Sequence, residues 1–186
     1  MTVAAVVLAA GGGSRFRGST HKLRAEIDGV PIVRRAVDAA VAAGLDETIV
    51  VVGAVELGDV LPAGVTVLRN DRWAEGQAGS LAVAVEHAAA AGHAAVVAGL
   101  GDQPFVPSSA WRAVAEADHA PIVAAVYEGR RRNPVRLAAE VWPLLPRHGD
   151  EGARPLMARR PDLVGTVTCQ GDPVDIDRLE DLDAWS

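Results

Sequence analysis

The sequence has very little cysteine and no long hydrophobic run. Cys169 carries the only thiol among 186 residues, which excludes an internal disulfide or a cysteine metal cluster. No run approaches the roughly 18 apolar residues of a membrane span, and the start at Met1 lacks a secretory signal pattern, so we expect a soluble protein of the cytoplasm. Basic residues are also scarce: 18 Lys and Arg against 24 Asp and Glu give a net charge of -6, which argues against nucleic-acid binding.

Apolar runs rich in Val alternate with stretches of helical periodicity. The runs do not alternate with polar residues, as is typical of strands buried on both faces of a parallel sheet. They are residues 3–9, 48–52, 65–68, 94–100 and 122–126. Apolar residues recur at helical spacing over 33–41 and 81–88. The pattern predicts an α/β fold: one domain over residues 1–186, Rossmann-like and three-layered (αβα), with a mainly parallel sheet.

A glycine-rich loop follows the first predicted strand. Gly11-Gly12-Gly13 comes after Leu8-Ala9-Ala10, and Arg15 and Lys22 lie beyond it. A dinucleotide loop needs glycine where Phe16 stands, and a Walker A loop needs Ser or Thr after Lys22, so both are excluded. We interpret the loop as a phosphate cradle, in which backbone amides approach the phosphates and the two cations supply charge. A mobile turn with two solvated cations is the alternative.

Carboxylates follow the strand expected at residues 94–100. Asp102 stands at its carboxyl end, beside the expected glycine loop, and suits either a metal site or an ordinary turn. Asp175 and Asp177 alternate with apolar residues, so in an extended segment both side chains point to one face. Asp177 with Glu180 also resembles a helix capping box. A second metal ligand is therefore expected at Asp175 or Asp177.

A further helix is expected to open within residues 76–81, with Gly79 or Ser80 near its cap. The amino end of a helix suits an anion or the edge of a base or ribose, although capping alone explains these residues equally well.

Several other residues are expected to be structural. Arg130-Arg131-Arg132 is interpreted as a solvated loop, as is usual for a run of cations. His87 and His93 are expected at the surface, and Trp73 and Trp111 in the core.

Taken together, the motifs resemble the MobA-like NTP transferase family, and within it the molybdenum cofactor cytidylyltransferases. The loop from Leu8 to Arg15 has the family's form, and Lys22 follows it at a spacing one residue longer than in typical relatives. Five further motifs occur in the family's order: Asn70-Asp71-Arg72-Trp73-Ala74-Glu75-Gly76, Gly101-Asp102-Gln103-Pro104, Asn133-Pro134-Val135, Gly149-Asp150-Glu151-Gly152-Ala153-Arg154 and Asp175-Ile176-Asp177. The resemblance implies a fold of the nucleotide-diphospho-sugar transferase type.

The resemblance also implies an activity: CMP is transferred from CTP to the terminal phosphate of the molybdopterin-type molybdenum cofactor, and pyrophosphate is released. It implies catalytic roles for Arg15, Lys22 and Asp102, and Mg²⁺ held by Asp102 and Asp177. The implied nucleotide-binding residues are Leu8, Ala9, Ala10, Gly11, Gly12, Gly13, Arg15, Lys22, Asn70, Gly76, Gly79 and Ser80. The implied acceptor-binding residues are Gln103, Asn133 and Arg154. Ala10 indicates CTP, since relatives with glycine there tend to use GTP.

Two alternatives remain open. One is a transferase that uses GTP or another NTP with a different small phosphorylated acceptor. The other is a non-catalytic nucleotide-binding accessory protein for molybdoenzyme maturation, and a molybdoenzyme client is an expected partner. One departure from the family bears on the acceptor: relatives usually have a small residue where Arg132 stands, and an added cation there would help to hold an anionic acceptor.

Overall fold

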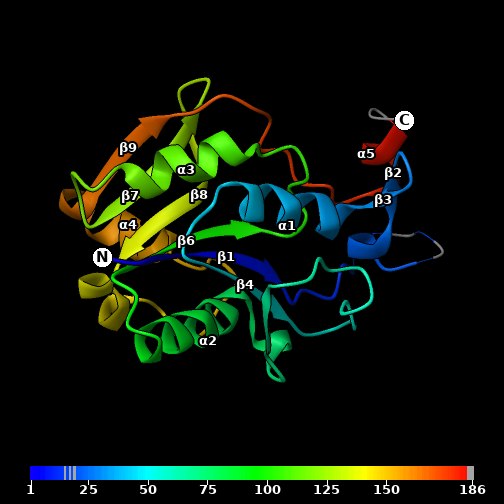
Figure 1. Ribbon diagram of the computed structural model, residues 1–186, viewed down its shortest axis with the longest axis horizontal. Helices are drawn as coiled ribbons and strands as arrows, with labels where there is room; N and C mark the ends of the chain where they lie inside the picture. The colour runs from blue at the N-terminus through cyan, green and yellow to red at the C-terminus, as the bar shows by residue number, and fades with distance from the viewer. Residues whose placement is uncertain (15, 17, 19, 184–186) are drawn as a thin grey trace.

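The computed structural model describes residues 1–14, 16, 18 and 20–183 (Figure 1). Its main sheet has seven strands in the order β5-β4-β1-β6-β8-β7-β9. The strands are β1 (Val3–Ala9), β4 (Glu47–Val52), β5 (Thr66–Arg69), β6 (Ala95–Leu100), β7 (Ile122–Tyr127), β8 (Arg130–Ala138) and β9 (Val164–Thr168). Of these, β8 runs antiparallel to both of its neighbours, and the other pairings are parallel. A short hairpin, β2 (Glu26–Ile27) with β3 (Val30–Pro31), stands apart from the sheet.

Helices cover both faces of the sheet (Figure 1). The helices of the described residues are α1 (Ile32–Ala42), α2 (Gln77–Ala90), α3 (Ser108–Glu116), α4 (Arg154–Arg159) and α5 (Leu179–Asp183), of which α5 stands apart from the two faces. Short 3-10 helices form at Lys22–Arg24, Trp73–Glu75, Ala139–Leu144 and Pro161–Leu163. Alternate residues of β1 pack into two separate cores: Val7 lies with Val37 of α1 and Trp111 of α3, whereas Val6 lies with Leu81 of α2. The three-layer αβα fold predicted from the sequence is therefore confirmed.

The predicted parallel strands all form, within two residues of their expected bounds. The solvated loop expected at Arg130-Arg131-Arg132 is wrong, because these residues begin β8 and pair with Tyr127, Val126 and Ala125 of β7. Glu128 and Gly129, both at positive φ, make the turn between the two strands. The arginine side chains are exposed all the same, so the cationic run lies on a strand rather than in a loop.

The helix expected near Gly79 or Ser80 begins earlier, at Gln77, and Gly76 is its N-cap. Gly76 has a φ of 108°, which favours glycine, and its position lies against the backbone of Gly149. The amide of Ala78 donates to the Gly149 carbonyl at 2.9 Å. One of the free amides at this helix end is thus already used within the fold.

The surface position expected for His93 is also wrong. Its side chain is 7% exposed, and both His87 and His93 form hydrogen bonds with Glu47. These residues lie where the parallel strands of the sheet begin, here called the amino edge; the carboxyl edge is where those strands end. Trp111 is buried in the core as expected. The partner carboxylate lies 46 residues from His93 in the chain, so local sequence gave no sign of this cluster.

The two edges of the sheet differ in what they carry. The carboxyl ends of β1, β4, β5 and β6 lie together on the right of Figure 1, with the β2-β3 hairpin and α5. Since β8 is antiparallel to β6, its first residues extend to the same edge. Open α/β sheets bind ligands at this edge.

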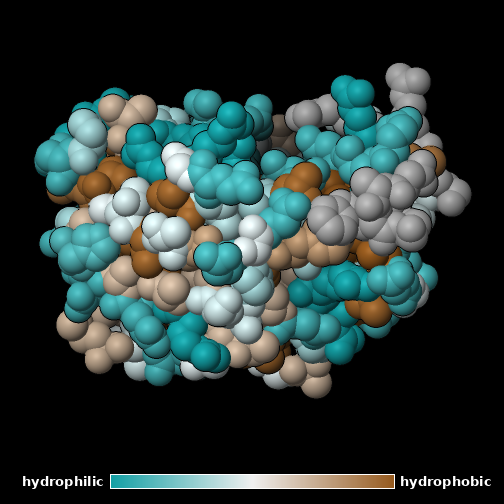
Figure 2. Space-filling view, turned by 90° about the horizontal axis from the view of Figure 1, so that it is seen from above, coloured by the Kyte–Doolittle hydropathy of each residue, from teal (hydrophilic) through white to brown (hydrophobic). Residues whose placement is uncertain are grey.

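The outer surface is mostly hydrophilic where α1 and α3 face the viewer in Figure 2. There the hydrophobic residues lie in small groups among hydrophilic ones. Within the described residues, none of the helices has the length and apolar content needed to cross a membrane.

Candidate functional site

The glycine loop forms one wall of a cavity of about 400 Å³ at the carboxyl end of β1. Gly12 lies close to the Trp73 indole: a Cβ at this position would stand 2.9 Å from the ring. Gly13 has a φ of 61°, a conformation that favours glycine. Close packing and a left-handed turn together explain why small residues occur here, and they leave the loop's backbone next to the cavity.

Lys22 lies where the loop meets the two predicted metal ligands. Its Nζ donates to Asp102 Oδ2 at 2.6 Å and to Asp177 Oδ1 at 3.0 Å, and the side chain is only 11% exposed. Burial favours a lower pKa for Lys22, but the charge and the hydrogen bond of Asp102, followed by those of Asp177, outweigh it and raise the pKa. Lys22 is therefore a permanently charged ammonium at the edge of the cavity.

The Asp102 carboxylate retains capacity to bind a further cation. Asp102 Oδ1 is buried and has no hydrogen-bond partner among the described residues. Such an oxygen is costly unless a ligand satisfies it. The described part of the chain holds no cluster of three or more His, Cys, Asp or Glu arranged for a metal ion. A divalent ion at Asp102 and Asp177 would thus complete its coordination with phosphate oxygens and water, which fits Mg²⁺.

Asp175 has different partners from Asp177. Its Oδ1 accepts from Gln103 Nε2 at 2.9 Å, and Gln103 Oε1 accepts from Asn133 Nδ2 at 3.3 Å. Burial, followed by the charge of Asp102, raises the pKa of Asp175. Between the two aspartates, Ile176 is fully buried and its amide donates to the Asp102 carbonyl at 2.9 Å. This anchor holds both carboxylates beside the end of β6.

The capping box expected from Asp177 and Glu180 forms differently. The amides of Asp177 and Arg178 both donate to Asp181 Oδ2 at 2.8 Å, so Asp181 caps this segment. The side chain of Asp177 forms the ion pair with Lys22.

The structure brings most of the predicted nucleotide-binding residues together. Those that line the cavity of the glycine loop are Leu8, Ala9, Ala10, Gly11, Gly12, Gly13, Lys22, Gly76 and Ser80, with Asp102. Asn70 and Gly79 are not part of this lining. Asn70 is buried and donates to Ser80 Oγ at 3.0 Å, so it supports the wall from behind. The prediction for Arg15 lies outside the described residues.

Sequence reasoning missed six lining residues, and three of them have side chains with polar or aromatic groups. Trp73, expected in the core, is half-buried and lines the cavity, as do Gln77 and Asp150. All three lie in or next to motifs that carried the resemblance, which was the signal available for them.

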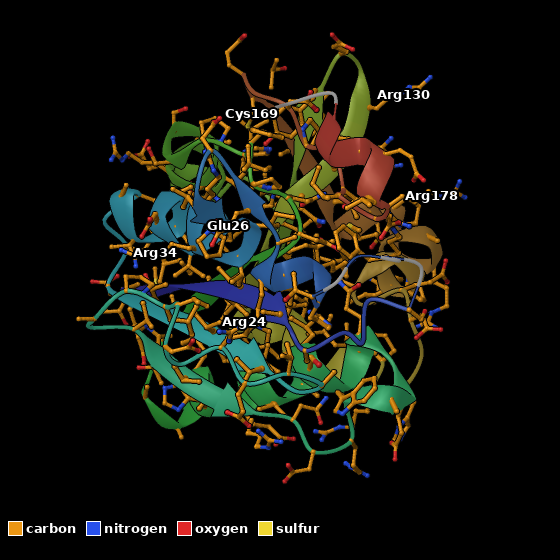
Figure 3. All side chains as sticks on the ribbon, turned by 90° about the vertical axis from the view of Figure 1, so that its right-hand side faces the viewer. Arg24, Glu26, Arg34, Arg130, Cys169 and Arg178 are labelled. Carbon is orange, nitrogen blue, oxygen red and sulfur yellow. The ribbon has the colours of Figure 1, made fainter. Side chains whose placement is uncertain are left out.

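Two further cavities continue from the first. The middle cavity, of about 270 Å³, shares Leu100 and Asp102 with the cavity of the glycine loop. It shares Arg154 with a third cavity, of about 250 Å³. The predicted acceptor-binding residues Gln103, Asn133 and Arg154 all line this last cavity. Figure 3 looks onto this edge of the sheet. The site is thus a series of connected hollows, with Lys22 and the carboxylates where the first hollow meets the next.

Comparison with known families gives one match over most of the chain. A family model described as the MobA-like NTP transferase domain matches residues 5–164. A search of curated proteins finds no significant match.

Solved structures give close matches of the whole fold. A nucleotidyl transferase from Methanothermobacter thermautotroptrophicus is 28% identical, with a TM-score of 0.83 over 98% of this chain and 95% of that one. Rv0371c from Mycobacterium tuberculosis is 26% identical, with a TM-score of 0.86 over 100% of this chain and 97% of that one. A complex of Rv0371c with manganese is 26% identical, with a TM-score of 0.83 over 100% and 98%. These likenesses confirm the fold of the nucleotide-diphospho-sugar transferase type.

Proposed function

Because the chain belongs to the MobA-like NTP transferase family and is a nucleotidyltransferase, we propose that it transfers CMP from CTP to the terminal phosphate of the molybdopterin-type molybdenum cofactor. The observation that carries the proposal is the position of Lys22, which pairs with Asp102 and Asp177 at the edge of the glycine-loop cavity. Cations, carboxylates and a backbone cradle at one point are what transfer at a phosphorus atom requires.

In the proposed reaction, an oxygen of the acceptor's phosphate forms a bond to the α-phosphorus of CTP. The bond from this phosphorus to the oxygen that bridges to the β-phosphate breaks, and pyrophosphate leaves with the electron pair. No protein nucleophile takes part. The amides of Gly11 to Gly13 and the ammonium of Lys22 hold the triphosphate and neutralise the charge that grows on the leaving group. We assign Arg15 the same role.

Asp102 and Asp177 are proposed to hold Mg²⁺, which supplies charge neutralisation and alignment of the phosphate oxygens when it is bound. The buried, unpartnered Asp102 Oδ1 supports this assignment, and so does the manganese complex of a relative. Asp177 is preferred to Asp175 as the second ligand because it shares the Lys22 ammonium with Asp102, whereas Asp175 contacts Gln103.

The cytidine preference rests on Ala10, which is buried and lines the cavity. We place the enzyme in the cytoplasm, with a molybdoenzyme as the client that receives the product. The nucleotide preference is tested with Ala10→Gly, which we expect to shift the enzyme from CTP towards GTP.

The direct test is release of pyrophosphate, measured with CTP, GTP, ATP and UTP against a panel of phosphorylated acceptors that includes the molybdenum cofactor. The proposal predicts release that depends on both CTP and the cofactor. A clear preference for GTP would overturn the cytidine assignment. CTP binding without release, whichever acceptor is present, would indicate an accessory protein instead of an enzyme.

A further inference from the structure

The cavity that holds the predicted acceptor-binding residues is strongly cationic, although the protein as a whole is acidic. Arg131, Arg132 and Arg154 line it, and Asp175 is the only carboxylate that lines it within the described part of the chain. Three cations against one anion stand in contrast to the net charge of -6 for the whole chain. This concentration of positive charge suits an anionic ligand.

Several arginines of this protein are paired with carboxylates, but the guanidinium groups of these three have no partner among the described residues. Arg24 donates to Asp59, and Arg34 donates to Asp38, each at 2.8 Å. By contrast, the guanidinium groups of Arg131, Arg132 and Arg154 form no hydrogen bond or ion pair with any other described residue. Their charge is not used to hold the fold together, and it remains available to a ligand.

The topology explains how the arginines reach this place. Val135 of β8 pairs with Ala98 near the end of β6, and β8 is antiparallel to β6. The residues before Val135 therefore extend past the carboxyl end of β6, towards the edge that carries Asp102. Arg131 and Arg132 lie on this extension, opposite Arg154 at the start of α4.

The arginine cavity is distinct from the place where the reacting phosphate must lie. Neither Lys22 nor Asp102 lines the arginine cavity, and neither Arg131 nor Arg132 lines the cavity of the glycine loop. A phosphate that attacks the nucleotide has to approach Lys22 and Asp102. That position lies outside the cavity that Arg131 and Arg132 line.

We infer that the acceptor carries a second anionic group, which Arg131, Arg132 and Arg154 bind while its phosphate reacts near Lys22. The inference rests on the proposed function and narrows its substrate class to small acceptors with two separated anions. Leu100, Val135 and Met157 supply apolar surface for the skeleton that joins them. The second anion can be a carboxylate, a phosphate or a thiolate, since a guanidinium group binds each of them.

The test compares ω-phosphonoalkanoates of increasing chain length with alkylphosphonates of the same length. Each pair differs only in the carboxylate. Binding is measured by calorimetry on the full chain with Mg²⁺ and saturating α,β-methylene CTP, so that the glycine-loop cavity is filled. At the best chain length, the carboxylate should tighten binding by about tenfold, the effect of one charge-assisted hydrogen bond.

Matched variants locate the effect. Arg132→Gln and Arg131→Gln should each remove most of the gain in affinity that the carboxylate gives. Arg132→Lys should keep part of this gain, because lysine keeps the positive charge but cannot donate two parallel hydrogen bonds to the carboxylate. Arg159→Gln, at the other end of α4, and Arg130→Gln should leave it unchanged. Neither residue lines the arginine cavity, and Figure 3 shows Arg130 pointing outward from the start of β8. Unchanged binding of the CTP analogue reports that each variant is folded.

Equal affinity for both members of every pair would overturn the inference. An equal loss in Arg159→Gln and Arg132→Gln would overturn it too, because the gain would then be general electrostatics. The outcome is separate from that of the proposed function. Pyrophosphate release with an acceptor that has a single anion would support the transferase and contradict the second-anion site. The converse, selective binding of the carboxylate without release, would support the site and contradict the transferase.

Discussion

The two edges of the sheet each carry a cluster of charged side chains, and the clusters are built differently. At the amino edge, Glu47 Oε1 accepts from Thr66 at 2.6 Å and contacts His87 Nε2 at 2.9 Å, and Oε2 contacts His93 Nε2 at 2.8 Å. At the carboxyl edge, Asp102 Oδ1 has no partner among the described residues and its carboxylate lines open cavities. Both oxygens of Glu47 are satisfied by the fold, whereas Asp102 keeps one for a ligand.

The comparison teaches that a group of ionisable residues is not enough to identify a site. The amino-edge cluster joins β4, β5 and the end of α2, and its role is to hold these elements together. The carboxyl-edge cluster also includes ion pairs, but a cavity and an unsatisfied oxygen accompany them. Changes at the carboxyl edge should therefore alter activity more than stability, and changes at the amino edge should do the reverse.

The largest expected effect is on turnover at the carboxyl edge. Lys22→Ala and Asp102→Ala should each lower the rate of pyrophosphate release by roughly 100-fold to 1,000-fold, because Lys22 supplies positive charge to the reacting phosphates and Asp102 is proposed to hold the Mg²⁺ that does the same. Steady-state assays at a temperature where thermal unfolding shows each variant folded provide the measurement. Near-normal release in both variants would show that the catalytic site lies elsewhere.

The next effect is on stability at the amino edge. Glu47→Gln removes the charge that faces two histidines and should lower the free energy of unfolding by about 2 kcal/mol. Denaturant titration measures the loss, and turnover below the melting temperature should stay within about twofold, a difference that corresponds to only ~0.4 kcal/mol. If turnover fell as far as in Lys22→Ala, the two edges would not be separable in function.

The same cluster predicts a pH dependence. Burial favours a higher pKa for Glu47, but hydrogen bonds from Thr66, His87 and His93 outweigh it and lower the pKa from 4.5 to about 2. A carboxyl whose pKa is lowered in the folded state stabilises the fold above its unfolded pKa. That contribution is lost as the pH falls from 4.5 towards about 2. Melting temperatures of wild type and Glu47→Gln should therefore converge over this acid range, and a constant gap between them would refute the linkage.

The smallest effect concerns the support of the glycine loop. A methyl group at Gly12 would stand 2.9 Å from the Trp73 ring, so Gly12→Ala should shift the loop and raise the KM for CTP about fivefold, roughly 1 kcal/mol. The double variant Gly12→Ala/Trp73→Leu should recover part of this loss because the smaller side chain makes room. Additive effects in the double variant would mean that the ring does not position the loop.

The sequence predicts the central parallel strands well, and it misses the strands β8 and β9 for identifiable reasons. Runs of Val in β1, β4 and β6 are buried on both faces, so their composition alone marks them as strands. β8 begins with three arginines, and β9 has exposed positions, so neither has that composition. Their place in the sheet is set by pairing with β7, which no local pattern encodes.

The sequence predicts which strand ends carry the candidate site, but it does not predict the contacts between residues within the site. Asp102 was expected beside the glycine loop because both follow parallel strands. The ion pair of Lys22 with Asp177 joins residues 155 positions apart, and the burial of Ile176 that places Asp177 there depends on the whole fold. The sequence predicts a core position for Trp73, because an aromatic side chain on a cavity wall has the same local sequence as a buried one.

The central claim is that the α-phosphate of the nucleotide moves to an acceptor at the carboxyl edge. Its most direct test follows label from CTP labelled at the α-phosphate, with the molybdenum cofactor and Mg²⁺ present. The account predicts that the label appears in a dinucleotide product that forms together with pyrophosphate and is lost in Lys22→Ala but not in Glu47→Gln. Label that remains in CTP, or appears only in free CMP whether or not the acceptor is present, would contradict it.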